Sequence, residues 1–148
     1  MKQTIVKDRK YLSKPCRPCD DVITGEMIGK KLLSVLEQTK DGAGLAANQI
    51  GIDARVAVVS VPRRKPIVLV NPKIIGKFKK ITFQEGCLSF PGDYILTERY
   101  ANILVKADNH PKALNFSAEE NILECVCVQH EIDHLDGITM FDRQVKEK

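Results

Sequence analysis

The amino-acid sequence predicts an α+β fold, and three observations lead to this prediction. Segments with helical periodicity lie at residues 24–40 and 117–137, and segments rich in β-branched residues lie between them. Helices and strands do not alternate along the chain, as they do in folds built on a parallel sheet. No repeat and no long linker divides the sequence. We therefore expect residues 1–148 to form a single domain.

The first helix is expected over residues 24–40. Its apolar side chains form one stripe, made up of Ile28, Leu32, Val35 and Leu36. Thr24 is a suitable N-cap because its hydroxyl can accept a backbone N–H, and Gly42 tolerates the left-handed conformation that ends a helix. Five strands are expected to follow, at residues 55–61, 67–70, 77–83, 101–107 and 113–116.

The last helix has the clearest signals in the sequence. Ser117 and Glu120 have the S-x-x-E spacing of a capping box, and Gly137 suits the end of the helix. Four residues recur at every fourth position and are expected to share one helix face: Ile122, Val126, His130 and His134. The two histidines therefore belong to an otherwise apolar stripe.

Composition and charge exclude several classes of protein. Hydrophobic residues make up 43% of the chain and charged residues 28%, which is enough apolar material for a core. No apolar run approaches the roughly 18 residues of a membrane span, and the first residues lack the pattern of a signal or transit peptide. The net charge is +4, but with no Trp, three Tyr and five Phe there is no stacking platform for nucleic acid. We expect a cytoplasmic protein without a specific nucleic-acid partner and without a membrane partner.

The cysteines fit a reducing compartment. Their number is odd and their spacing uneven: Cys16, Cys19, Cys87, Cys125 and Cys127. Cys16 and Cys19 have the C-x-x-C spacing of metal or redox pairs, but no second pair accompanies them. We interpret these two as ordinary thiols.

Residues 130–134 read H-E-x-x-H inside the last helix. Two histidines one turn apart point the same way, so both imidazoles can bind one cation, and Glu131 lies beside them. A zinc-type ion lowers the pKa of its water ligand toward 7, and a neighbouring carboxylate can accept the proton. The alternative is a pair of solvent-facing histidines, which their apolar stripe disfavours.

A third metal ligand cannot be found downstream of the motif. Metzincin-type proteases carry a third histidine where this chain has Met140. The only later glutamate is Glu147, in a charged tail. His110, the remaining histidine, lies in a turn-like Asn-His-Pro segment and is expected at the surface.

Cysteines are the remaining candidates upstream of the motif. Cys87 lies in the segment Glu-Gly-Cys-Leu-Ser at residues 85–89, after a probable strand, where a turn could present its sulfur. Cys125 and Cys127 are alternatives on the helix itself, and only Cys127 could lie near the histidine face. A Cys/His/His set plus one water fits a catalytic metal site with an open position.

A glycine-rich segment at residues 42–49 is the third candidate. It lacks the Lys-Ser/Thr of a P-loop and the preceding strand of a dinucleotide fingerprint. It could instead bring backbone close to an extended ligand, with the Gln49 amide as a donor to an oxyanion. The alternative is that Gln49 is an ordinary loop amide.

Taken together, G-x-G-L-A-A-x-Q, E-G-C-L-S and H-E-x-D-H resemble the three signature motifs of peptide deformylases, in that order and at these separations. The resemblance implies small antiparallel or mixed β-sheets packed around a central C-terminal helix that carries the H-E-x-x-H motif, plus an N-terminal helix. It implies a hydrolase that removes the formyl group from N-formylmethionyl nascent peptides and releases formate. The alternative function is another H-E-x-x-H metallohydrolase, a peptidase or amidase.

The resemblance also implies roles for individual residues. The expected metal ligands are Cys87, His130 and His134. Glu131 is expected to act as general base and acid, with the Gln49 amide and the Leu88 N–H as oxyanion donors. Three further residues are expected to contact substrate, namely Gly44 through its backbone and Val126 and Cys127 in the methionine pocket. Gln129 and Asp133 could orient the ligands. The expected cofactor is one divalent ion, Fe2+ in the cell, with Zn2+, Ni2+ or Co2+ as alternatives.

Two departures from the family pattern add expectations. Tyr94 stands near a position where many relatives carry arginine, so contacts to the second or third substrate residue are expected to differ. The chain also stops soon after the last helix, whereas many bacterial relatives continue into a basic C-terminal helix. We therefore expect one catalytic domain without a long C-terminal extension, and ribosome association that is weak or absent.

Overall fold

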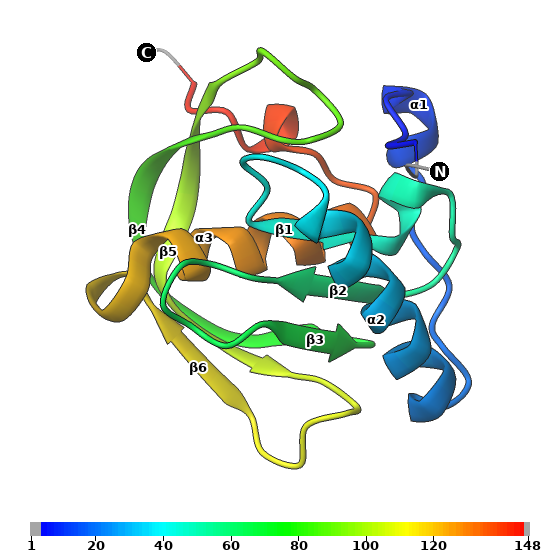
Figure 1. Ribbon diagram of the computed structural model, residues 1–148. Coiled ribbons are helices and arrows are strands. Elements are labelled where there is room, and N and C mark those ends of the chain that lie inside the picture. Colours follow the sequence, from blue (N-terminus) through cyan, green and yellow to red (C-terminus); the bar gives the residue numbers. More distant parts are fainter. Residues whose placement is uncertain (1–3, 147–148) are drawn as a thin grey trace.

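The computed structural model describes residues 4–146 and places two three-stranded antiparallel sheets on either side of a long helix, α3 (Figure 1). The first sheet has the order β1-β2-β3 and the second β4-β5-β6. The strands are β1 Gly44–Ala46, β2 Val56–Val59, β3 Ile67–Val70, β4 Lys73–Glu85, β5 Ile95–Lys106 and β6 Leu114–Ser117. The helices are α1 Arg9–Leu12, α2 Val22–Glu37 and α3 Ala118–Leu135, with 3-10 helices η1 Ala47–Ile50 and η2 Met140–Arg143. The predicted α+β class is confirmed.

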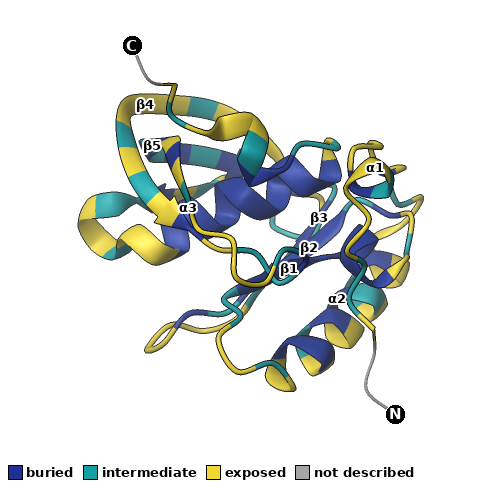
Figure 2. Cartoon of the chain, turned by 90° about the horizontal axis from the view of Figure 1, so that it is seen from above, coloured by how far each residue is buried: buried dark blue, intermediate teal, exposed yellow. Residues whose placement is uncertain are grey.

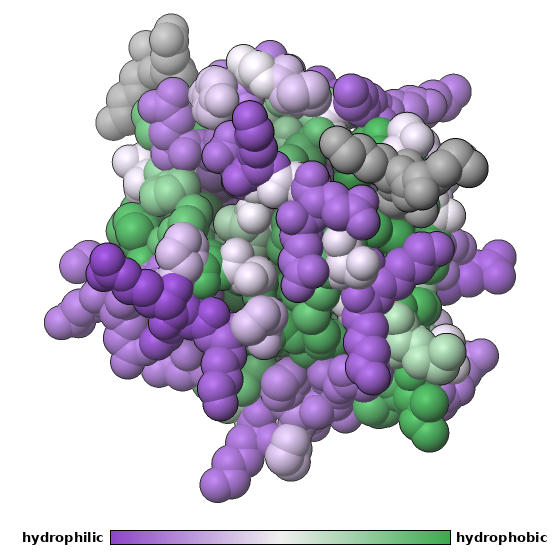
Figure 3. Space-filling model, in the orientation of Figure 1, coloured by the Kyte–Doolittle hydropathy of each residue, from purple (hydrophilic) through white to green (hydrophobic). Residues whose placement is uncertain are grey.

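Helix α2 starts earlier and ends earlier than expected. Its N-cap is Asp21, whose carboxylate accepts the N–H of Thr24 at 2.7 Å, so Thr24 is inside the helix and its assignment as N-cap was wrong. Gly25 and Gly29 let the helix lie against β3, because a Cβ on Gly25 would be 2.5 Å from Val70 Cγ1. The outer face leaves Ile23 and Met27 exposed, and Figure 3 shows green side chains there at the lower right.

The strands differ from the sequence prediction mainly in length. β4 and β5 form a long hairpin in which Lys73 pairs with Lys106 at one end and Glu85 with Ile95 at the other. The sequence predicted only the middle of β4, residues 77–83, and the second half of β5, from residue 101. The first half of β5 was missed because Thr97 and Arg99 are polar, yet both are buried. β1 was missed because Gly-Leu-Ala has low β-propensity. Within residues 4–146 it is an edge strand that pairs with β2 alone.

Helix α3 is interrupted in its first turn. The Ser117 hydroxyl accepts the Glu120 N–H at 3.1 Å, as the S-x-x-E spacing predicts. Asn121 then adopts an extended backbone (φ −161°, ψ 99°), and its side chain caps the main helix by accepting the Glu124 N–H at 3.0 Å. Because of this break Ile122 is 43% exposed, so its predicted place on the buried face is wrong. Gly137, at φ 76°, follows the helix end as expected.

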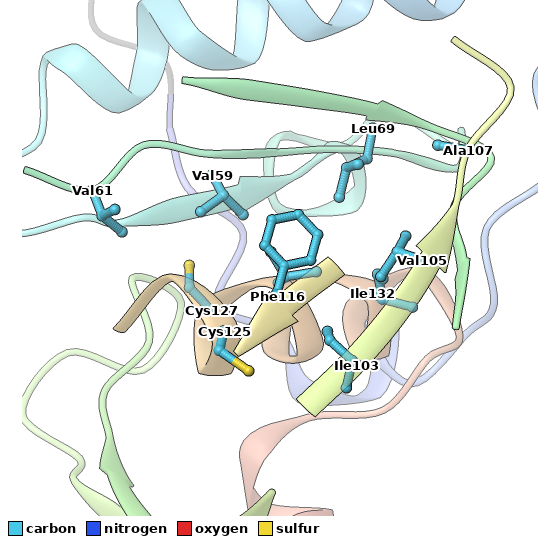
Figure 4. Packing of buried hydrophobic residues seen from close by; sticks show 11 residues of the cluster. Val59, Val61, Leu69, Ile103, Val105, Ala107, Phe116, Cys125, Cys127 and Ile132 are labelled. Carbon is cyan, nitrogen blue, oxygen red and sulfur yellow. The ribbon is translucent and has the colours of Figure 1, made fainter. Parts of the chain in front are cut away.

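Residues 124–135 of α3 are all buried (Figure 2), because the helix lies between the two sheets. Phe116 of β6 lies at the centre of one core cluster (Figure 4). Val59 and Leu69 of the first sheet lie on one side of its ring, and Ile103 of β5 and Ile132 of α3 lie on the other. A second cluster packs α2 against the first sheet through Leu32, Leu36 and Val58. The core therefore fixes α3, and with it the H-E-x-x-H motif, from two directions. Within residues 4–146, no helix is long and apolar enough to cross a membrane.

Candidate metal centre and active-site cleft

The rings of His130 and His134 lie side by side on α3 in an edge-on arrangement, with centroids 4.9 Å apart. Their Nε2 atoms are 3.2 Å apart, and the side chains are 6% and 0% exposed. The loop that follows β4 brings Cys87 to the same point, with Sγ 3.4 Å from His134 Nε2. One ligand atom from each of these three residues lies within 4.8 Å of the other two. Such a convergence of one sulfur and two ring nitrogens is the donor set of a metal centre with an open fourth position.

The other residues weighed as ligands lie elsewhere. His110 Nε2 is 2.9 Å from the Val68 carbonyl oxygen. The Cys125 thiol lies 3.5 Å from the Tyr100 carbonyl, on the β5 side of the helix. Cys127 lies beside Glu131, with Sγ 3.8 Å from Oε2. Among the three candidate cysteines, only Cys87 joins the histidines.

A buried carboxylate fixes the orientation of His130. Glu85 Oε1 is 2.8 Å from His130 Nδ1, so Nδ1 carries the proton and donates, which leaves the Nε2 lone pair directed into the centre. Arg99 holds Glu85 with two hydrogen bonds, of 2.5 and 2.8 Å, and the Thr97 hydroxyl donates to the same carboxylate. Burial opposes ionisation of Glu85, but the hydrogen bonds from Arg99 and His130 and the Arg99 charge outweigh it and lower its pKa to about 2. Glu85 is therefore an anion that accepts a hydrogen bond from His130 Nδ1–H.

The residues present fit a divalent metal ion. Burial lowers the pKa of His134 well below its usual value, so this ring is neutral, the form that binds metal. Its Nδ1 is buried without a hydrogen-bond partner within residues 4–146, and its Nε2 is the ring nitrogen that lies near Cys87 and His130. Imidazole and thiolate donors together suit zinc or ferrous iron.

Glu131 lies next to the centre with one oxygen unpaired. The side chain is 3% exposed, and Oε1 has no hydrogen-bond partner within the described residues. Burial is the main cause that raises its pKa to about 7, and the negative charge of Glu85 adds to the effect. A carboxylate with a pKa near neutrality can take up and return a proton.

Gln49 is held in place from two sides. Its Oε1 accepts the Ala46 N–H at 2.9 Å, and its Nε2 donates to Ser89 Oγ at 3.0 Å and lies 3.6 Å from Cys87 Sγ. Leu88 follows Cys87 in a turn, and its N–H forms no backbone hydrogen bond within residues 4–146. An amide and a backbone donor therefore flank the sulfur.

A cleft of about 440 Å³ opens onto this centre. Its lining includes eight of the nine residues expected to act as metal ligands, catalytic groups or substrate contacts, and the ninth, His134, lies deeper. The eight are Gly44, Gln49, Cys87, Leu88, Val126, Cys127, His130 and Glu131. Gly44 allows β1 to approach α3, because a Cβ there would be 2.6 Å from Cys127 Sγ and 2.7 Å from Glu131 Oε2. Tyr94 also lines the cleft and is exposed, against Gly86.

Two residues near the site differ from expectation: Arg99 was not predicted, and Gln129 was expected to orient the metal ligands but does not. Gln129 binds the backbone of Tyr100, by accepting its N–H at 2.9 Å and donating to its carbonyl at 2.8 Å, and does not touch a ligand. Arg99 connects Asp133 to Glu85 through its guanidinium. The only sequence signal for Arg99 is a charged residue in an otherwise strand-like segment, which does not reveal its partners.

Comparisons with known proteins agree with this geometry. The chain matches the family described as polypeptide deformylase over residues 1–148. It is 42% identical over 137 residues to the peptide deformylase of Hydrogenovibrio crunogenus, covering 88% of this chain and 78% of that protein. The crystal structure of the peptide deformylase from Thermus thermophilus superposes with a TM-score of 0.86 at 30% identity, over 98% of this chain and 86% of that one. A Met-Ala-Ser-bound peptide deformylase from Acinetobacter baumannii superposes with a TM-score of 0.80 at 25% identity, over 94% and 96% of the two chains.

These matches confirm the resemblance of the three motifs and extend it to the whole chain. They agree with the separate observation that a cysteine and two histidines converge in a cleft. The chain therefore belongs to the polypeptide deformylase family of metalloenzymes, which remove the N-terminal formyl group from newly made polypeptides.

Proposed function

We propose that Cys87, His130 and His134 hold one divalent metal ion, Fe2+ in the cell with Zn2+, Ni2+ or Co2+ as replacements. The convergence of their ligand atoms and the fixed tautomer of His130 support this assignment. When bound, the ion supplies Lewis acidity, which polarises a carbonyl group and lowers the pKa of water. Glu85, through its hydrogen bond to Nδ1, increases the basicity of the His130 ligand.

The substrate is the N-formylmethionyl end of a nascent peptide. The open edge of β1 borders the cleft, so an extended peptide can add beside Gly44 as a further strand. Val126 and Cys127 lie on the cleft wall and offer an apolar surface to the methionine side chain. The peptide Met-Ala-Ser bound to the Acinetobacter baumannii relative is the deformylated form of such a substrate.

Three groups of the chain assist the attack of water on the formyl carbon. Glu131 accepts a proton from the attacking water and passes it to the leaving amine. Gln49 Nε2 and the Leu88 N–H donate hydrogen bonds to the carbonyl oxygen as negative charge develops on it. Because Ala46 and Ser89 already fix the Gln49 amide, it needs little reorganisation during the reaction.

The unpaired Glu131 oxygen beside the three converging ligand atoms is the observation on which this assignment rests. Elsewhere on α3 the buried carboxylates have partners, for example Glu124 with Arg64 at 2.9 Å. A buried oxygen without a partner costs free energy, about 1–3 kcal/mol. We interpret it as the group that contacts water and substrate.

The variant Glu131→Gln should keep the metal and lose turnover. The amide preserves the shape of the side chain but cannot accept the proton, so we expect formate release from formyl-Met-Ala-Ser to fall by about 100- to 10,000-fold. Elemental analysis and circular dichroism should match those of Glu119→Gln, an exposed change on the same helix. A folded, metal-loaded Glu131→Gln protein with a normal rate would refute the assignment.

The variant Gly44→Ala tests the contact between β1 and α3. The added methyl must displace Cys127 or Glu131, and we expect kcat/KM to fall by about 10- to 100-fold, since small misplacements of catalytic groups have such effects. Gly76→Ala is the matched control, because the nearest heavy atom to its added Cβ is 3.5 Å away. Equal activity in the two variants contradicts the role of Gly44.

We further propose that residues 1–148 act as one catalytic domain in the cytoplasm and associate only weakly with ribosomes. Strands β4 and β5 contain six Lys or Arg and two Glu, so they carry as much net charge as the entire chain, +4. Five of those lysines are exposed, and in the described residues only Lys80 forms an ion pair. Co-sedimentation with ribosomes is expected at about 50 mM salt and should be lost at about 200 mM. Binding that persists at the higher salt contradicts weak association.

A further inference from the structure

A chain of charged side chains connects the C-terminal segment to the candidate metal ligand His130. Arg143 of η2 binds both oxygens of Asp133, with Nε–Oδ2 and Nη2–Oδ1 distances of 3.0 Å each. Arg99 Nη1 donates to Asp133 Oδ2 at 2.5 Å, and the same guanidinium binds Glu85. Glu85 Oε1 then accepts a hydrogen bond from His130 Nδ1–H, with the nitrogen and oxygen 2.8 Å apart.

The inner part of this chain is not neutral by itself. Glu85, Asp133 and Arg99 have side chains that are 3%, 9% and 3% exposed, and they carry two negative charges against one positive charge. A buried charge without a partner is strongly unfavourable. Arg143 supplies the second positive charge through a bidentate contact, which is the strongest geometry for a guanidinium and a carboxylate. Without it, Asp133 and Glu85 compete for Arg99.

The position of Arg143 is built into the fold, although its side chain is 43% exposed. The buried Met140 anchors η2, and the Val145 N–H donates to the Leu96 carbonyl of β5 at 2.8 Å. Phe141 packs edge-on against Phe90, with centroids 4.9 Å apart, and Phe90 lies in the turn that carries Cys87. The same segment therefore contacts both β5, which carries Arg99, and the turn that carries Cys87.

We propose that Arg143 is a positioning residue for the metal centre. By compensating Asp133 it keeps Arg99 on Glu85 and Glu85 on His130, so the docking of residues 140–145 sets how tightly the metal is held. This inference depends on the proposed ligand set of Cys87, His130 and His134. A residue that only stabilised the fold would change the unfolding temperature and leave metal affinity as it is.

The test compares Arg143→Met and Arg143→Lys with Arg55→Met. Arg55 forms an ion pair with Asp136 at 2.6 Å, at the same end of α3, but does not contact Glu85, Arg99 or Asp133. Affinity is measured by chelator competition on the full chain loaded with Zn2+, and the ligand field by the visible spectrum of the Co2+ form. Thermal unfolding of the metal-free proteins is recorded in parallel.

We expect Arg143→Met to bind Zn2+ about 10- to 100-fold more weakly, as for other losses of support to a ligand. Arg143→Lys should recover part of this loss, because it keeps the charge but not the bidentate fork. Arg55→Met should lower the unfolding temperature and leave Zn2+ affinity and the Co2+ spectrum unchanged.

Two outcomes overturn the proposal: wild-type affinity and spectrum in Arg143→Met, or an equal loss of affinity in Arg55→Met. If Arg143→Met does not fold, Arg143→Lys decides, and wild-type affinity in that variant counts against the proposal. Failure of the ligand set itself gives a different result, since Cys87→Ser would then bind Zn2+ as tightly as the wild type.

Discussion

Residues 124–135 of α3 are all buried, so each polar side chain among them needs a partner inside the protein. Most have one: Glu124 binds Arg64, Gln129 binds the Tyr100 backbone, and Asp133 binds two arginines. Two atoms on this helix have none within residues 4–146, namely Glu131 Oε1 and His134 Nδ1. Both belong to residues of the H-E-x-x-H motif. Glu131 Oε1 is therefore the buried carboxylate oxygen of this helix that is left for the proposed chemistry, while His134 directs its other ring nitrogen, Nε2, toward Cys87 and His130.

Burial on all sides also makes the centre depend on several segments. The histidines come from α3, the sulfur from the loop after β4, and the Gln49 amide from η1 after the edge strand β1. Glu85 ends β4 and reaches His130, while Arg99 of the paired strand β5 secures it. Because β4 and β5 form one continuous hairpin, the register of that hairpin determines whether Glu85 and Arg99 meet. The geometry of the centre is therefore a property of the sheet as much as of the motif.

The parts that the sequence predicts well depend on local spacing. Two histidines at i and i+4 share a face of any α-helix, and Ser117 caps the N–H three residues later. The errors occur where a neighbour changes the local geometry. Asn121 recaps α3 and turns Ile122 outward, and Asp21 takes the capping role expected of Thr24. Long-range pairs such as Glu85 with Arg99, or Arg143 with Asp133, were not visible in the sequence, because they meet only through the β4–β5 hairpin and the return of η2 along β5. Cys87 was one of three candidate cysteines by chemistry alone; the resemblance favoured it, and the structure brings it to the histidines.

If Cys87 completes a metal site with His130 and His134, replacing its sulfur in Cys87→Ser must change the metal content. The wild type, Cys87→Ser and Cys19→Ser are purified without oxygen, and metal content and formate release from formyl-Met-Ala-Ser are measured on the same samples. We expect one ion per chain and activity in the wild type and in Cys19→Ser, and loss or exchange of the metal in Cys87→Ser. Unchanged metal content in a folded Cys87→Ser protein would contradict this metal site.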